Sequence, residues 1–184
     1  MEEILEKITD FGDKAHGEQL RKYVPDRYMV HPVRVMEQLK QYTSDVTILA
    51  AALLHDVLED TPVTEGEISV FLSGLMTPEE VQRTVQLVLD LTDVYVKDDY
   101  PQLNRRTRKA KEIERLITTS PDAQTIKYAD ILDNTSEISD NDPSFAKVYL
   151  SEALAILQQV DRGNAELRKK TIDAVTKGLD KLTR

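Results

Sequence analysis

The sequence predicts an all-α fold, and two patterns carry that prediction. Apolar residues recur at intervals of three and four along most of the chain, which is the spacing of one helix face. Alternation with a period of two, which would indicate strands, is scarce. The hydrophobic content of 40% and the charged content of 31% are those of an ordinary globular protein, which argues against disorder and fibrous repeats.

About eight to nine helices are expected from this periodicity. Their predicted ranges are 2–16, 31–42, 44–58, 64–73, 77–93, 104–118, 121–138, 143–160 and 164–182.

The first helices are justified by the residues that flank them. The opening segment, "MEEILEKITDF", is acidic and amphipathic, and its helix should stop at Gly17. Pro32 opens the second helix, because proline suits the first helical turn. Ser44 precedes "DVTILAAALL", the most apolar helix of the chain, and is expected to mark the start of the third helix.

The later helices have clearer start signals, in which a capping residue is followed by proline. These pairs are Thr77-Pro78, Ser120-Pro121 and Asp142-Pro143. Gly74 and Gly163 lie where preceding helices should stop. The segment "VYVKDDYPQL", residues 94–103, fits none of these patterns and is expected to form a loop, which could be mobile.

The length indicates one domain over residues 1–184, because a chain of this size can bury a single core. No internal repeat or linker divides it. The helices of residues 143–184 carry apolar stripes that either complete the core or form an interface between copies of the chain. The oligomeric state stays open.

Composition narrows the possible locations and partners. The chain has no cysteine and no basic leader, so a cytoplasmic protein without disulfides is expected. No stretch approaches the roughly 18 apolar residues that a membrane span requires. The net charge of −9 disfavours binding to nucleic acid, whereas a small anionic ligand remains compatible with a local basic patch or a metal ion. Any such metal needs nitrogen and oxygen ligands.

Four residues, distant in sequence, form a candidate ligand set. His31 opens one predicted helix, and His55-Asp56 ends the most apolar one. Asp130 follows apolar residues on the predicted helix of residues 121–138. Imidazoles and carboxylates together suit Mn²⁺, Fe²⁺ or Zn²⁺. Each dipeptide alone is more often a cap or a surface pair, so the prediction depends on their order and on their apolar surroundings.

These residues stand within three longer motifs, "AHGEQLRKYVPDRYMVHP", "AALLHDVLEDT" and "SPDAQTIKYADILDN". Together the motifs resemble the HD-domain phosphohydrolases, and within them the hydrolase domain of RelA/SpoT alarmone enzymes and the single-domain small alarmone hydrolases. The resemblance covers roughly residues 10–140. It implies a helical HD-domain fold and hydrolysis of the 3′-pyrophosphate of guanosine tetra- or pentaphosphate, with release of pyrophosphate.

The resemblance also implies roles for particular residues. The metal ligands, usually of Mn²⁺ although other divalent ions are possible, would be His31, His55, Asp56 and Asp130. The acidic pair beside the reacting pyrophosphate would be Glu59 and Asp60, and the residues that contact or organise the nucleotide would be Arg21, Lys22 and Asn134.

Two inferences come from the residues themselves. Glu59 lies four residues after His55, so if the helix continues the two share a face, and the carboxylate could orient or deprotonate an attacking water. In the basic run "RRTRKAK", Arg105, Arg108 and Lys109 could hold the outer phosphates, although such a run is also typical of a solvated helix face.

Two positions depart from the family pattern and leave alternatives open. Ile131 stands where a basic residue is usual, and Ser136 stands where arginine is frequent. Less positive charge should weaken polyphosphate binding, so a different phosphate ester, such as a nucleotide or NADPH, is the second hypothesis. A non-catalytic nucleotide-binding module is the third. His16 is interpreted as a structural or capping residue.

Overall fold

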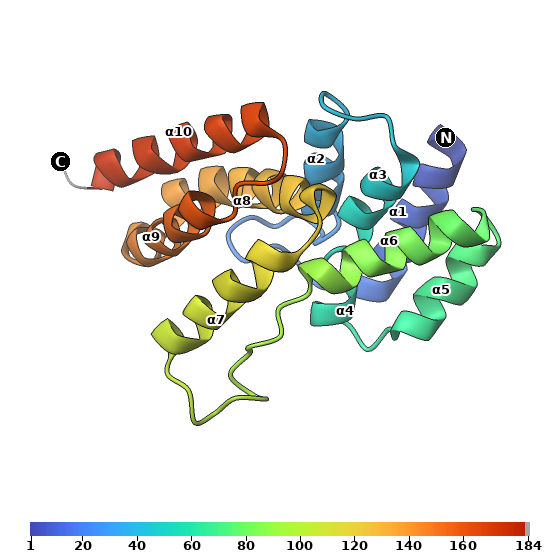
Figure 1. The fold of residues 1–184 in the computed structure, drawn as a ribbon, viewed down its shortest axis with the longest axis horizontal. Helices are drawn as coiled ribbons and strands as arrows, with labels where there is room; N and C mark the ends of the chain where they lie inside the picture. The colour runs from blue at the N-terminus through green and yellow to red at the C-terminus, as the bar shows by residue number, and fades with distance from the viewer. Residues whose placement is uncertain (183–184) are drawn as a thin grey trace. The chain divides into compact units, whose positions relative to one another are not determined.

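The computed structural model describes residues 1–182, which fold into helices joined by loops and turns, as the all-α prediction requires (Figure 1). The chain forms two compact units, Met1–Thr92 and one that begins at Asp93. The helices of the first unit are α1 (Glu2–His16), α2 (Val30–Leu39), α3 (Val46–Leu54), α4 (Val57–Asp60), α5 (Glu65–Ser73) and α6 (Pro78–Leu91). Those of the second are α7 (Arg105–Thr118), α8 (Pro121–Asn141), α9 (Pro143–Gln159) and α10 (Ala165–Leu182).

Helix α3 is the centre of the first unit. It contacts α1, α2 and α6 and is buried from Thr47 through Leu54 (Figure 1). A helix that is apolar on all sides has to be covered on all sides, which explains why three helices surround it. Residues at its carboxyl end are therefore held on a buried scaffold.

The start of α3 is fixed by Asp45, one residue after the predicted Ser44. The Asp45 carboxylate accepts hydrogen bonds from the backbone nitrogen and the hydroxyl of Thr47, at 2.9 and 2.7 Å. Arg83 of α6 donates to its other oxygen at 2.6 Å. Burial opposes ionisation of Asp45, but the Thr47 hydrogen bonds and the Arg83 guanidinium outweigh it and lower the pKa of this carboxyl.

Asp45→Ala should therefore lower the free energy of unfolding by about 1–2 kcal/mol, because α3 loses its cap. Asp45→Asn keeps an oxygen for Thr47 and should lose less. Because the pKa is lowered in the folded state, ionised Asp45 stabilises the fold fully above its ordinary pKa of about 4, and this stabilisation is lost as the pH falls through the lowered value. Denaturant unfolding of the wild-type protein, Asp45→Ala and Asp45→Asn, from neutral pH down to below about pH 4, measures the loss of stability and its pH dependence. Equal losses in the two variants would contradict the capping role.

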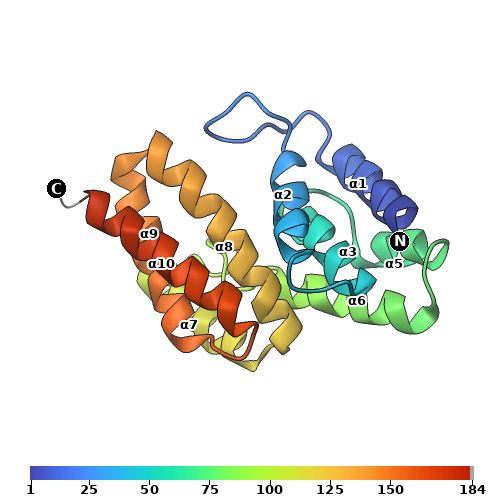
Figure 2. The ribbon, with the colours of Figure 1, turned by 90° about the horizontal axis from the view of Figure 1, so that it is seen from above.

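The second unit is organised around α8, which contacts α9 and α10, while α7 contacts α9 (Figure 2). Leu150 and Leu157 of α9 and Leu167 and Val175 of α10 are fully buried. The apolar stripes of α9 and α10 thus contribute to the core of this unit.

Gly163 has a different role from the predicted helix stop, because α9 already ends at Gln159. A Cβ on Gly163 would lie 2.5 Å from Tyr128 Cε2 and 2.8 Å from the backbone nitrogen of Thr125. The buried Tyr128 hydroxyl donates to the Val160 carbonyl at 2.9 Å and accepts from the Gly163 nitrogen at 3.2 Å. Glycine is needed here because the loop passes directly over the Tyr128 ring.

Most predicted boundaries agree with the structure to within a few residues. Thr77, Ser120 and Asp142 each accept a hydrogen bond at the start of their helix, and Gly17 ends α1 with a φ of 57°. Residues 94–103 contain no helix, as expected. Among residues 1–182, none of the helices combines the length and apolar character needed to cross a membrane.

Candidate metal centre

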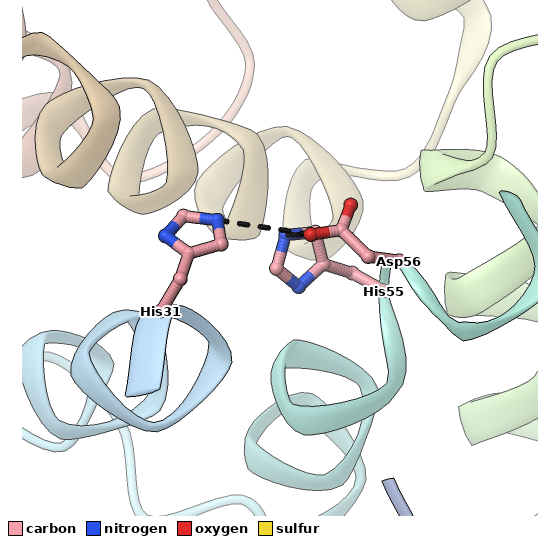
Figure 3. Close-up of side chains that lie close together, drawn as sticks. All are labelled: His31, His55 and Asp56. Atoms are coloured by element: carbon pink, nitrogen blue, oxygen red, sulfur yellow. Dashed lines mark ion pairs between the residues drawn. The ribbon is translucent and has the colours of Figure 1, made fainter. Parts of the chain in front are cut away.

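Three of the four predicted ligands come together in the first unit. His31, His55 and Asp56 each offer one ligand atom, and these atoms lie within 4.8 Å of one another (Figure 3). Asp56 Oδ2 lies 3.2 Å from His55 Nε2 and 3.8 Å from His31 Nε2. The imidazoles are 1% and 4% exposed for His31 and His55. Two imidazole nitrogens and one carboxylate oxygen therefore face a common point.

A break in the third predicted helix lets neighbouring residues share this point. Adjacent residues in a regular helix do not face each other. Helix α3 ends at Leu54, however, and α4 begins only at Val57, so His55 and Asp56 occupy the break. The expectation of one helix over 44–58 is wrong here, and His55 and Glu59 do not lie on one continuous helix.

The hydrogen bond of His55 fixes which ring nitrogen can bind a metal. His55 Nδ1 lies 2.8 Å from the Ala52 carbonyl oxygen, which can only accept, so Nδ1 carries the proton. Nε2, on the side of Asp56, keeps its lone pair. A backbone carbonyl that orients the outer nitrogen is a common feature of metal-binding histidines. The donor set and its tautomer thus fit a divalent first-row metal ion.

Tyr28 orients the carboxylate of this cluster. Its hydroxyl donates to Asp56 Oδ2 at 2.8 Å. Burial, together with the carboxylates of Asp56 and Asp60, raises the pKa of the Tyr28 hydroxyl far above its ordinary value, so this group remains a donor. Tyr28 is not among the residues selected from the sequence, and it lies in the turn before α2, so no helical spacing links it to His31.

The acidic pair lies on α4, directly after the cluster. Glu59 and Asp60 are exposed, in contrast to the buried imidazoles. Asp60 Oδ2 accepts a hydrogen bond from Gln19 Nε2 at 3.2 Å. These carboxylates are accessible to a solute at the edge of the cluster.

The loop before α2 places Arg21 beside Tyr28. The Arg21 guanidinium lies 5.4 Å from the centre of the Tyr28 ring, and the Lys22 ammonium lies 4.8 Å from the centre of the Tyr23 ring. Because Tyr28 donates to Asp56, Arg21 belongs to the surroundings of the cluster. Lys22 is exposed.

The fourth predicted ligand, Asp130, lies on α8 of the second unit and is 6% exposed. Its Oδ1 accepts from Asn134 Nδ2 at 2.7 Å, and its Oδ2 accepts from Lys127 Nζ at 2.9 Å. Burial disfavours the charged form of Lys127, but Asp130 and Asp93 more than offset this and raise the pKa of its ammonium. Asp133, on the same helix, is also buried, at 8% exposure.

The predicted phosphate clamp on α7 has partners within the second unit. Arg105 forms two hydrogen bonds to Glu152, at 2.7 and 2.8 Å. Arg108 donates to the Leu103 carbonyl, and Lys109 donates to Asp93 at 2.9 Å. A phosphate would have to compete with these groups, so the clamp stays a prediction.

Comparison with known proteins identifies the family to which the region around this site belongs. The family model described as "HD domain" matches residues 28–135, which include all four predicted ligands. A guanosine-3′,5′-bis(diphosphate) 3′-pyrophosphohydrolase of Homo sapiens, MESH1, is 31% identical over 138 residues, which are 73% of this chain and 69% of that protein. A probable enzyme of the same name from Mycoplasma pneumoniae is 28% identical over 85% of this chain.

A solved structure supports the same relationship. It is described as a metazoan orthologue of SpoT that hydrolyses ppGpp, and it superposes with a TM-score of 0.78, 26% identity and 96% coverage of both chains. The chain spans only about a fifth of the Mycoplasma pneumoniae relative, 21% of its length. HD domains bind divalent metal ions, which agrees with the donor set of His31, His55 and Asp56. The chain therefore belongs to the HD-domain family, in the group that includes the guanosine-3′,5′-bis(diphosphate) 3′-pyrophosphohydrolases.

Proposed function

We propose that the chain is a metal-dependent phosphohydrolase that releases pyrophosphate from the 3′ position of guanosine-3′,5′-bis(diphosphate) and similar nucleotides. The observation that carries this proposal is the cluster of two buried imidazoles, His31 and His55, with the partly exposed Asp56, followed at once by the exposed carboxylates of Glu59 and Asp60. The names of the human and Mycoplasma relatives support this substrate class.

For the metal we propose Mn²⁺, with Asp130 as the fourth ligand. The support is the order of His31, His55-Asp56 and Asp130 within the range matched by the family model. A bound divalent ion would supply Lewis acidity toward a water molecule and a phosphate oxygen. Asn134 and Lys127 each donate a hydrogen bond to one oxygen of the Asp130 carboxylate, so a metal ion bound to Asp130 would share this carboxylate with the Lys127 ammonium.

Roles for the other residues follow from their chemistry. Glu59 and Asp60 would orient the attacking water and accept its proton, because ionised carboxylates act as general bases. Arg21, Lys22 and Asn134 would contact or organise the nucleotide. The cations of Arg105, Arg108 and Lys109 would contact the outer phosphates, where guanidinium groups offer paired hydrogen bonds. The proposed substrate is thus a small anionic nucleotide, and the proposed location is the cytoplasm.

A second candidate function is hydrolysis of a different phosphate ester, such as another nucleotide or NADPH. It is favoured by Ile131 and Ser136, because Ile131 is buried and neither side chain carries positive charge for a polyphosphate. A non-catalytic nucleotide-binding module is less well supported, since binding alone does not require the acidic pair Glu59 and Asp60.

A substrate panel separates these functions. Purified protein would be incubated with guanosine and adenosine 3′-pyrophosphorylated nucleotides, other nucleotides and NADPH, each with Mn²⁺ and with excess chelator. We expect Mn²⁺-dependent release of pyrophosphate from the 3′-pyrophosphorylated nucleotides and none with chelator. Release of orthophosphate from another ester would favour the second function. Tight nucleotide binding without turnover of any compound would favour the binding module.

A further inference from the structure

His16 contacts two side chains that hold the candidate site, although it is not part of the metal cluster. It is the last residue of α1 and is 7% exposed. Its Nδ1 lies 2.9 Å from Gln19 Oε1, and its ring stacks on Tyr28, with 4.4 Å between ring centres and 27° between ring planes. One buried imidazole therefore contacts both Gln19 and Tyr28.

Gln19 and Tyr28 each donate a hydrogen bond to a carboxylate of the site. Gln19 Nε2 donates to Asp60 Oδ2 at 3.2 Å, and the Tyr28 hydroxyl donates to Asp56 Oδ2 at 2.8 Å. Since the amide nitrogen of Gln19 donates to Asp60, its oxygen is left to accept from His16 Nδ1. The hydrogen bonds thus run in one direction, from His16 through Gln19 to Asp60.

The other nitrogen of His16 argues against a purely stabilising role. His16 Nε2 is buried and has no hydrogen-bond partner among the described residues. Leaving a buried polar group unpaired destabilises the folded state. A phenylalanine would fill the same space beside Tyr28 without this cost, so the feature that requires histidine is the hydrogen bond from Nδ1.

From these contacts we infer that His16 is a positioning residue, which holds Asp60 through Gln19 and Asp56 through Tyr28. The inference rests on the proposed function for the role of Asp60, whereas the role of Asp56 is tested by metal binding alone. His16 would set the separation between the acidic group at the rim and the carboxylate ligand in the cluster, and it touches neither substrate nor metal.

Four variants separate the two branches of this network. The Asp60 branch runs from His16 through Gln19, and the Asp56 branch runs from His16 through Tyr28. His16→Phe keeps a ring against Tyr28 but loses the bond to Gln19, and Gln19→Leu breaks the same branch one step later. We expect each to lower kcat about tenfold while leaving KM and Mn²⁺ affinity within about twofold of wild type. Tyr28→Phe removes the donor to Asp56, and His16→Ala removes both supports. These two should weaken Mn²⁺ binding about tenfold, measured by calorimetry.

A matched control comes from Gln41, an exposed glutamine of the same unit whose backbone nitrogen bonds to Gln38. Gln41→Leu should retain wild-type kcat and Mn²⁺ affinity. The double variant His16→Phe/Gln19→Leu provides the sharpest test. If His16 acts through Gln19, the double variant should lower kcat no further than either single change, because the effects of substitutions within one network do not add.

The outcomes decide between positioning and general packing. Full multiplication of the two kcat losses, or wild-type kcat in His16→Phe, overturns the inference. Wild-type Mn²⁺ affinity in both Tyr28→Phe and His16→Ala overturns the Asp56 branch. If His16→Ala fails to fold, Tyr28→Phe and the double variant still decide. Absence of turnover in the wild-type protein would defeat the proposed function, while the order of Mn²⁺ affinities would still test the inference.

Discussion

Replacing Asp56 by alanine should abolish both metal binding and turnover. The change removes the only carboxylate of the cluster in the first unit and leaves the imidazoles of His31 and His55. Even changes to groups that merely orient a ligand cost about 10–100-fold in metal affinity, so loss of a ligand should cost at least about 100-fold. Turnover should fall to background, because the metal's contribution to water activation is lost.

Calorimetry with Mn²⁺ and a pyrophosphate-release assay measure the two effects. Asp10→Ala is the matched control, because Asp10 is an exposed aspartate on α1 in the same unit. The variant should keep its helical circular dichroism, since Asp56 lies between helices rather than inside one. Wild-type Mn²⁺ affinity in Asp56→Ala would show that the metal binds elsewhere and would remove the basis of the proposed function.

Most of the fold could be predicted because its determinants are local. The caps at Thr77, Ser120 and Asp142 act within one helical turn, so they are readable as short motifs. The break at His55 and Asp56 could not be predicted, because the surrounding run is apolar and favours a continuous helix. The prediction that Gly163 ends a helix was wrong for a related reason. Glycine is required there by a close contact with Tyr128, 35 residues away in sequence, and no local sequence pattern indicates such a contact.

The candidate site was predicted only in part. Histidine and aspartate are recognisable in a sequence as metal-ligand types, and their order and apolar surroundings allowed His31, His55 and Asp56 to be selected before their geometry was known. Tyr28 and Gln19 could not, because tyrosine and glutamine are common and their partners are 28 and 41 residues away. The supporting hydrogen bonds of a site depend on tertiary packing, which gives them no fixed spacing along the chain.

Glu59→Gln should separate catalysis from metal binding. The amide keeps the size of the side chain but cannot take a proton, so kcat should fall by about 10²–10⁴-fold if Glu59 is the base. Mn²⁺ affinity should stay within about twofold, because the cluster consists of His31, His55 and Asp56 and does not include Glu59. Turnover of a 3′-pyrophosphorylated nucleotide and Mn²⁺ calorimetry on the same preparation measure the two quantities.

Asp60→Asn distinguishes the two members of the acidic pair. An asparagine oxygen can still accept from Gln19 Nε2, so the side chain keeps its position and loses only its charge. If Glu59 is the base and Asp60 acts through its charge, Asp60→Asn should slow turnover less than Glu59→Gln does. Glu65→Gln, at an exposed position on α5, is the control that should leave turnover unchanged. If Glu59→Gln retains wild-type kcat, then Glu59 is not the base, and a larger loss in Asp60→Asn would transfer that role to Asp60.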